Sequence, residues 1–161
     1  MLICDYPSIV VDDCIFLGRA DQAANPRVRD NLSLTHIINI TRDHPNAFPD
    51  DLQYYRVEVD DDSTAELLHE FPSLIHFMKS ALHQGGRLLV HCNLGRSRSS
   101  TVVIAYLMFC RKWSLRDAYF FLKDRRPIIH PNRNFIGQLS KFEEIIFGRK
   151  LTNIANLHRG Q

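Results

Sequence analysis

Residues 85–110 read GGRLLVHCNLGRSRSSTVVIAYLMFC, and this stretch decides which fold we expect. The short run Arg87–Val90 follows two glycines and predicts a buried β-strand. Nine unbroken apolar residues, Val102–Cys110, predict a buried α-helix. The polar residues 91–100 therefore join a strand to a helix.

This joining segment combines a cysteine with groups that bind anions. A Cys92 thiolate would be a nucleophile, and backbone N–H groups, a helix N-terminus and arginine all stabilise such an anion. The first amides of the helix lack intrahelical partners and can bind a phosphate, which Gly95 would let the backbone approach closely. Arg98 lies six residues after Cys92. Its planar guanidinium can hold two phosphate oxygens, so the segment predicts attack by sulfur on a phosphate monoester.

A plainer interpretation is that Cys92 is an inert, buried, small apolar side chain, as most buried cysteines are. The combined pattern argues against this, because His91, Gly95, Arg98 and a following serine surround Cys92 at one strand-to-helix junction. The segment is not a Walker loop, since no Gly-Lys-Ser/Thr is present.

Residues His91–Ser99 resemble the His-Cys-x5-Arg-Ser signature of the cysteine-dependent protein phosphatases, in particular the atypical dual-specificity class of the protein tyrosine phosphatase superfamily. The resemblance extends over roughly residues 8–147. It rests further on Ile15–Gly18, Thr35–Thr41, Pro131-Asn132, Phe135 and Gln138-Leu139. It implies one α/β domain with a central, mostly parallel sheet of about five strands and helices on both faces, and the order of predicted elements agrees.

Four further segments have periodic patterns. Residues 54–59 alternate and favour a strand, whereas apolar residues at helical spacing predict a helix from Leu67 to Leu82. A second helix is predicted over Ser114–Arg125, because its first residues resemble a capping box. The last helix is expected from Asn132 to Gly148.

Length and composition fit one domain. The chain has 161 residues, of which 45% are hydrophobic and 24% charged. We expect a catalytic domain over residues 1–148 and a polar, partly disordered tail over residues 149–161. No apolar run approaches the ~18 residues of a membrane span, and the first residues do not resemble a signal peptide. We therefore expect a soluble cytoplasmic protein, with the nucleus as a further location, and no stable insertion into membranes.

The cysteines and the net charge limit the partners further. Four cysteines, Cys4, Cys14, Cys92 and Cys110, lack the spacing of a zinc site. We therefore expect neither a metal nor a cofactor. A net charge of +2 gives no reason to expect nucleic acid. The expected partner is a phosphoprotein substrate.

A leaving alkoxide or phenoxide needs a proton, so a general acid is required. In the resembled family this acid is an aspartate on a mobile loop before the cysteine, and Asp60, Asp61 and Asp62 lie in that window. Alignment of Leu67 and Phe71-Pro72 with the family pattern selects Asp61, with Asp60 as second choice. At least two of the three are expected to be solvated turn carboxylates.

The resemblance implies a two-step mechanism. Cys92 attacks phosphorus while Asp61 protonates the leaving oxygen, and water then hydrolyses the phosphocysteine. Ser99 is expected to assist the departing sulfur. His91 is expected to orient the loop and favour the thiolate, or to be purely structural, and Asn132 is expected to support the site. The phosphate is expected to contact Asn93, Leu94, Gly95, Arg96, Ser97 and Arg98.

Three functions remain open: a protein phosphatase, a lipid phosphatase and a module that only binds phosphoproteins. The chain lacks a Lys-Asn-Arg-Tyr-type segment, which walls a deep phosphotyrosine pocket in tyrosine-specific relatives, so phosphoserine and phosphothreonine should enter as well as phosphotyrosine. Arg96 is unusual for the class, and residues 95–99 also resemble a branch that hydrolyses phospholipids and phosphoinositides. Arg96 could equally point to solvent. A non-catalytic module that binds phosphoproteins is the third alternative. Arg125-Arg126 with Arg133 would form either a basic rim near the pocket or a solvated face.

Overall fold

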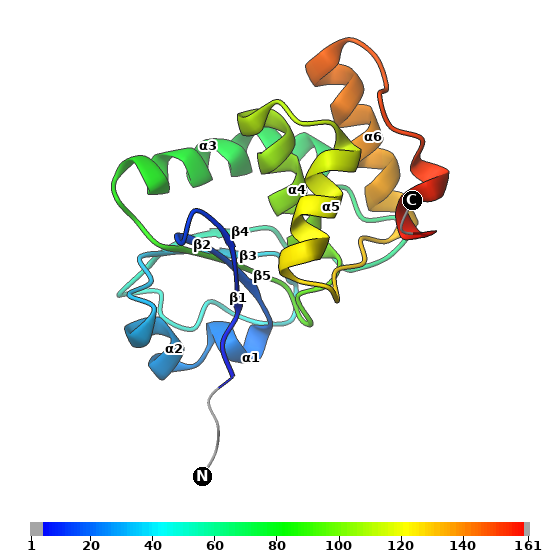
Figure 1. Ribbon diagram of the computed structural model, residues 1–161. Coiled ribbons are helices and arrows are strands. Elements are labelled where there is room, and N and C mark those ends of the chain that lie inside the picture. Colours follow the sequence, from blue (N-terminus) through cyan, green and yellow to red (C-terminus); the bar gives the residue numbers. More distant parts are fainter. Residues whose placement is uncertain (1–4, 160–161) are drawn as a thin grey trace.

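Five short strands form one sheet in the computed structural model, which describes residues 5–159 (Figure 1). The order across the sheet is β1-β2-β5-β3-β4, with β1 antiparallel to β2 and the other three pairs parallel. The strands are β1 (Ser8–Val11), β2 (Ile15–Gly18), β3 (His36–Asn39), β4 (Gln53–Arg56) and β5 (Leu88–His91). The predicted mostly parallel sheet is confirmed.

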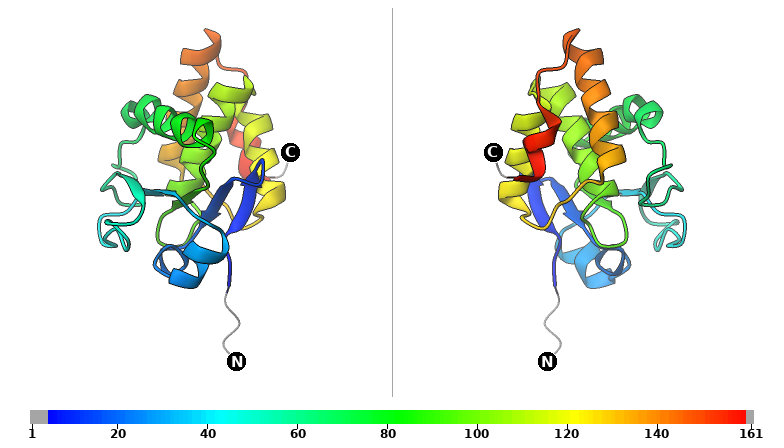
Figure 2. Two further views of the ribbon diagram at one scale, coloured as in Figure 1. Left: turned by 90° about the vertical axis from the view of Figure 1, so that its left-hand side faces the viewer. Right: turned by 90° about the vertical axis from the view of Figure 1, so that its right-hand side faces the viewer.

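Helices cover both faces of this sheet, as predicted (Figures 1 and 2). The short helices α1 (Ala20–Ala23) and α2 (Pro26–Asn31) lie on one face. The longer helices lie on the other: α3 (Phe71–His83), α4 (Arg98–Arg111), α5 (Leu115–Arg125) and α6 (Arg133–Phe147). Two 3-10 turns, η1 (Leu68–Glu70) and η2 (Ile154–Arg159), precede α3 and follow α6. No helix in the described residues has the length and apolar character needed to cross a membrane.

The central strand β5 contributes to both apolar layers of the core. Leu88 and Val90 pack into the large cluster under α3–α6, whereas Leu89 packs into the smaller cluster under α1 and α2. Alternate residues of a strand point to opposite faces, so a sheet covered on both faces needs continuous apolar strands. Helix α4 lies centrally among α3, α5 and α6, and its residues 98–108 are all buried. This burial explains the unbroken apolar run that predicted it.

Two element boundaries differ from the sequence expectation. The strand expected over residues 54–59 is β4, which ends at Arg56 because its only partner, β3, ends opposite at Asn39. The helix expected from Leu67 begins instead as η1, and α3 starts at Phe71. Pro72 then occupies the first turn of α3, where a missing N–H breaks no helical hydrogen bond.

The N-terminal third contains three elements that the sequence patterns did not reveal, namely β1, α1 and α2. β1 and β2 form a hairpin whose turn residues, Asp12 and Asp13, both have positive φ, as a tight two-residue hairpin turn requires. Helices α1 and α2 are too short to show a helical period. For α2, the cap Asn25 followed by Pro26 was the available signal, since this pair is typical of a helix start.

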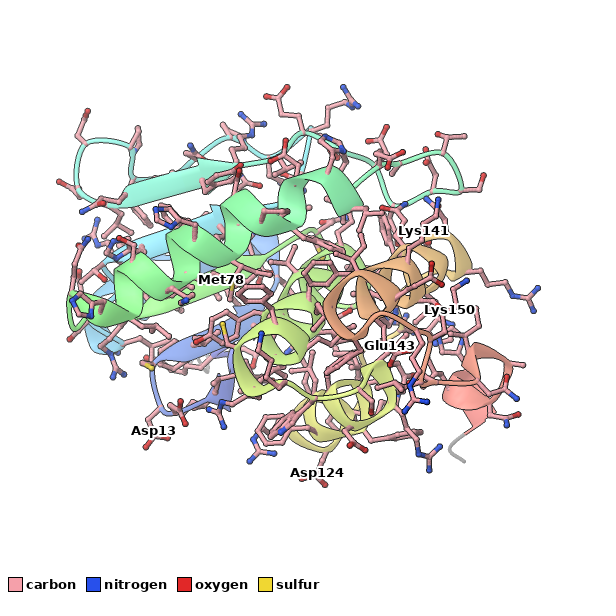
Figure 3. All side chains as sticks on the ribbon, turned by 90° about the horizontal axis from the view of Figure 1, so that it is seen from above. Asp13, Met78, Asp124, Lys141, Glu143 and Lys150 are labelled. Atoms are coloured by element: carbon pink, nitrogen blue, oxygen red, sulfur yellow. The ribbon has the colours of Figure 1, made fainter. Side chains whose placement is uncertain are left out.

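The residues after α6 are attached to α5 and α6 by hydrogen bonds over part of the described range. The buried carboxylate of Glu143 in α6 accepts hydrogen bonds from Leu151 N at 2.8 Å, Thr152 N at 3.0 Å and Leu115 N at 2.6 Å. Figure 3 shows Glu143 between α6 and the chain that follows it. Leu157 is also buried in the large cluster. Residues 151–159 are thereby attached to α5 and α6.

Candidate active site

The segment between β5 and α4 forms one side of a cavity of about 430 Å³. Its position follows from the fold, because β5 ends and α4 begins at the same edge of the sheet. The first amides of α4 lack intrahelical partners, and the helix dipole places partial positive charge here. The cavity is lined by Asp61, Cys92, Asn93, Leu94, Arg96, Ser97, Arg98, His130 and Asn132.

Cys92 lies at the floor of this cavity, with 3% of its surface exposed. Its Sγ atom is 3.1 Å from the hydroxyl of Ser99, in the first turn of α4. A hydroxyl at this distance can donate a hydrogen bond to a thiolate. Ser99 is fully buried, so the contact lies out of water. The sequence-predicted pair of Cys92 and Ser99 is thus in direct contact.

Arg98 reaches the same cavity, although it is largely buried. Its Nη1 donates to the carbonyl of Val59 at 3.0 Å. Its Nε is buried and has no hydrogen-bond partner among the described residues. Burial of an unpaired polar N–H is costly, and nearly all such groups find a partner. A phosphate oxygen in the cavity would supply an acceptor for this atom and strengthen binding by charge.

The loop turns sharply at Gly95, where φ is +68°. A side chain at this position would also collide, because an added Cβ would lie 2.6 Å from the carbonyl oxygen of Gly18 and 2.5 Å from Nη2 of Arg126. Glycine is therefore required both for the turn and for the close approach of the loop to β2.

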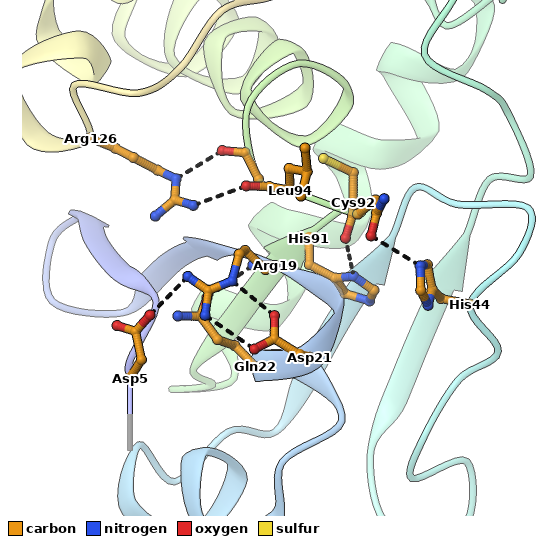
Figure 4. Close-up of polar contacts among 11 residues, drawn as sticks. Asp5, Arg19, Asp21, Gln22, His44, His91, Cys92, Leu94 and Arg126 are labelled. Carbon is orange, nitrogen blue, oxygen red and sulfur yellow. Dashed lines mark hydrogen bonds and ion pairs between the residues drawn. The ribbon is translucent and has the colours of Figure 1, made fainter. Parts of the chain in front are cut away.

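Arg126 is buried and supports the loop through hydrogen bonds, so it does not form an exposed basic rim around the cavity. Its Nε donates to Gly95 O at 2.8 Å and Nη2 to Leu94 O at 3.4 Å (Figure 4). Its Nη1 donates to Ser8 Oγ at 2.9 Å. Burial lowers the pKa of Arg126, and negative charge on Cys92 raises it. Arg126 is thus a second guanidinium that holds the loop carrying Cys92, a role that the sequence did not indicate. Arg125 and Arg133 are exposed.

The loop carbonyls face away from the cavity. Asn93 O accepts from Ala20 N at 3.0 Å, while Leu94 O and Gly95 O accept from Arg126. The C=O and N–H of one trans peptide point in opposite directions. The next amides along the chain therefore point toward the cavity, which forms the ring of donors that a phosphate needs.

His91 orients the loop as a neutral ring. Its Nδ1 lies 3.0 Å from the carbonyl oxygen of Cys92, which can only accept, so Nδ1 carries the proton (Figure 4). Burial lowers the pKa of His91 to about 4. At neutral pH the ring positions Cys92 but contributes no full positive charge to the thiolate.

The three consecutive aspartates have different partners. Asp61 lines the cavity, and its Oδ1 accepts from Asn132 Nδ2 at 2.8 Å. Asp60 lies 3.4 Å from Arg42 instead. Asp62 accepts from the backbone N–H groups of residues 64 and 65, and these bonds lower the pKa of Asp62. Of the three, only Asp61 faces Cys92 across the cavity.

Side chains of α6 hold the aspartate segment in place. Asn134 donates to Ala65 O at 2.7 Å, and Gln138 donates to the same oxygen at 2.8 Å. Gln138 also accepts from Leu67 N at 2.8 Å and Leu68 N at 2.9 Å. Asn132, the N-cap of α6, connects the two halves of the site, because its backbone N–H donates to Ser97 Oγ at 3.0 Å.

The remaining loop side chains lie around the cavity. Asn93 Oδ1 is 3.2 Å from Nε2 of His44, which lies in the segment between β3 and β4. Leu94 is 55% exposed. Arg96 lies at the cavity edge, where its Nε donates to Ile128 O at 3.2 Å. Its side chain is thus attached to the segment before α6 as well as lining the cavity.

The chain belongs to the dual specificity phosphatase family, since the family model described as "Dual specificity phosphatase, catalytic domain" matches residues 15–145. A probable rhodanese domain-containing dual specificity protein phosphatase of Dictyostelium discoideum is 38% identical over 86% of this chain and 29% of its own length. Human dual specificity protein phosphatase 1 is 40% identical over 80% of this chain and 35% of its own. The chain thus spans about a third of these relatives.

Solved structures agree with this family. The crystal structure of human DUSP28 has a TM-score of 0.82 and is 34% identical, over 89% of this chain and 96% of that one. In contrast to the longer relatives, this similar structure has nearly the same extent as the chain described here.

Proposed function

We propose that this protein hydrolyses phosphotyrosine, phosphoserine and phosphothreonine in protein substrates through a phosphocysteine intermediate. The observation that carries this proposal is the buried, unpartnered Nε of Arg98, which shares one anion-binding cavity with Cys92. Membership of the dual specificity phosphatase family supports the same conclusion.

In the first step, the Cys92 thiolate attacks phosphorus and an S–P bond forms while the P–O bond to the substrate breaks. The leaving oxygen takes a proton from Asp61, whose carboxyl group lines the opposite wall. Arg98 and the loop amides hold the transferring phosphoryl oxygens, where charge develops. The products are the dephosphorylated side chain and phosphocysteine.

In the second step, Asp61 as carboxylate removes a proton from water, and the oxygen of that water attacks phosphorus. The S–P bond breaks, and the sulfur leaves as a thiolate. Ser99 is 3.1 Å from this sulfur and stabilises the leaving thiolate with a hydrogen bond. Inorganic phosphate is released, and both Cys92 and Asp61 return to their starting states.

The test is turnover of para-nitrophenyl phosphate, followed by a panel of phosphotyrosine, phosphoserine and phosphothreonine peptides, under reducing conditions. We expect all classes to be hydrolysed by the unaltered protein and none by Cys92→Ser. A folded, reduced protein that binds phosphopeptides without turnover would overturn the proposal and favour a binding module.

A second candidate function, hydrolysis of phosphoinositides, is favoured by the position of Arg96. Its exposed guanidinium lies at the cavity rim, where it could hold a further phosphate of a lipid headgroup. Arg96→Ala should leave phosphopeptide turnover nearly unchanged if proteins are the substrates. A selective loss of phosphoinositide turnover in Arg96→Ala, and not in the exposed control Arg125→Ala, would support the lipid alternative.

A further inference from the structure

A second cavity, of about 140 Å³, borders His91, the residue that precedes the phosphate loop of residues 92–97. Its walls come from α1, from the segment between β3 and β4, from β4 and from the end of β5. They include Ala23, Ala24, His44, Pro45, Tyr54 and His91. None of the residues that line the substrate cavity, which is the 430 Å³ cavity around Cys92, lines this one. The two cavities are therefore separate, although His91, which lines one, is next in sequence to Cys92, which lines the other.

His91 connects this second cavity to the loop. One ring nitrogen, Nδ1, donates to the carbonyl of Cys92, while Nε2 has no hydrogen-bond partner among the described residues. The ring is only 3% exposed. The two nitrogens of an imidazole point to different sides, so Nε2 is directed away from the Cys92 carbonyl (Figure 4), and the ring lines the second cavity.

The state of His91 determines what this nitrogen can bind. Burial keeps the pKa of His91 near 4, so the ring is neutral at physiological pH. Because the single proton is on Nδ1, Nε2 presents a lone pair and acts as an acceptor. A ligand that satisfies it must donate an O–H or N–H. An anion would instead bring an acceptor against an acceptor.

The size of the cavity and the residues of its walls further restrict the class of ligand that can bind. Alanines and a proline make most of the surface apolar, and the oxygen of the Tyr54 hydroxyl accepts a hydrogen bond from Phe48 N at 2.9 Å. Apolar cavities of about 150 Å³ accommodate a benzene molecule. The space therefore fits one six-membered ring.

We propose that this cavity is an effector site for a small neutral ring compound with one hydrogen-bond donor, of the phenol class, which donates to Nε2 of His91. Two wall residues transmit its presence to the phosphate loop. His91 donates to the Cys92 carbonyl, and His44 is bonded to Asn93 Oδ1 at 3.2 Å. Donation to Nε2 polarises the ring and strengthens the Nδ1–H bond to Cys92, because hydrogen bonds in a chain reinforce one another.

The site can be tested by titrating phenol into the 161-residue chain while the ¹⁵N resonances of His91 are recorded. Saturating tungstate, an oxyanion, keeps phenol out of the substrate cavity. We expect a saturable upfield shift of Nε2, while Nδ1 keeps its proton. Anisole has a similar ring but no donor, and it should bind about tenfold more weakly, because it leaves the acceptor unpaired.

Two matched variants locate the binding. Ala24 is an exposed wall residue, so Ala24→Leu should fill the cavity and abolish the shift. Ala155→Leu adds the same side chain at an exposed position outside this cavity and should leave the shift unchanged. The proposal is overturned if His91 does not respond to phenol, if anisole binds equally well, or if the shift persists in Ala24→Leu. The readout does not require turnover, and it can be repeated in Cys92→Ser.

Discussion

The phosphate loop and the aspartate segment face each other across one cavity, yet they are held in different ways. Loop residues 92–97 are fixed by buried groups beneath them, namely His91, Arg126 and the amide of Ala20. The segment around Asp61 is more exposed, and amide side chains of α6 hold it. The loop is thus part of the core, whereas the segment depends on a few side chains from a helix about 70 residues further along.

This difference separates two tasks of the proposed chemistry. Attack on phosphorus and binding of the phosphate depend on the rigid loop. Delivery of the proton depends on Asp61 and its supports in α6. Changes in the loop should therefore reduce turnover of every substrate, whereas changes in the segment should matter most for substrates whose leaving group needs a proton.

Among variants that keep Cys92, the largest effect is expected at Arg98. Arg98→Lys keeps the charge but loses the planar fork and the unpartnered Nε, so kcat/KM for para-nitrophenyl phosphate should fall about 10²–10³-fold. Steady-state kinetics measures this loss, and alkyl phosphates should lose a similar factor. Nearly unchanged kinetics in Arg98→Lys would show that the guanidinium does not bind the transferring group.

Asp61→Asn should have the next largest effect, and it should depend on the leaving group. An amide cannot donate the needed proton, so kcat for a phosphoserine peptide should fall about 10²-fold, with a smaller loss for an aryl phosphate of good leaving group. The alkaline limb of the pH–rate profile should also disappear. Asp60→Asn is the control, since Asp60 is paired with Arg42 instead. If Asp60→Asn shows the larger loss, the acid is misassigned.

A smaller effect is expected when Asp61 remains but its support is removed. Asn132→Ser keeps an acceptor for the Phe135 N–H that caps α6 and loses the amide that bonds Asp61. We expect about a tenfold lower kcat on a phosphoserine peptide, since general acid catalysis requires a positioned donor. Asn25→Ser, the same change at the N-cap of α2, should leave kcat unaltered. Equal losses in both variants would mean that the effect is only one of stability.

The chemical signature of the loop could be read from the sequence because its nucleophile, glycine and arginine are local. The contacts that support the loop could not be predicted from the sequence. Arg126 and His44 contact the loop from distant positions in the sequence. No sequence pattern indicates which arginine donates a hydrogen bond to a loop carbonyl and which is exposed to solvent. Among the three aspartates, only the family resemblance selected Asp61, because nothing in the local pattern distinguishes them. Their different partners, above all Asn132, come from long-range packing.

His91 should affect stability more than turnover. It is neutral when folded, with a pKa of about 4, whereas an exposed histidine titrates near 6.5. Below about pH 6.5 the unfolded chain binds a proton that the folded chain does not, so stability falls as the pH drops toward 4, by about 3 kcal/mol in total. His91→Asn keeps an N–H near the position of Nδ1 and should remove this part of the pH dependence. Denaturant unfolding at pH 7 and pH 4 measures it, and the same pH dependence in both proteins would contradict the prediction.

The most direct test of the account is to look for the phosphoryl group on Cys92. Ser99→Ala removes the hydroxyl 3.1 Å from the sulfur and should slow the second step, so that phosphocysteine accumulates. The variant is mixed with para-nitrophenyl phosphate, quenched in alkaline denaturant, digested and analysed by mass spectrometry. The account predicts one phosphoryl group on the peptide that contains Cys92, and none in Cys92→Ser. Continued turnover with the phosphoryl group on another residue, or on no residue, would contradict it.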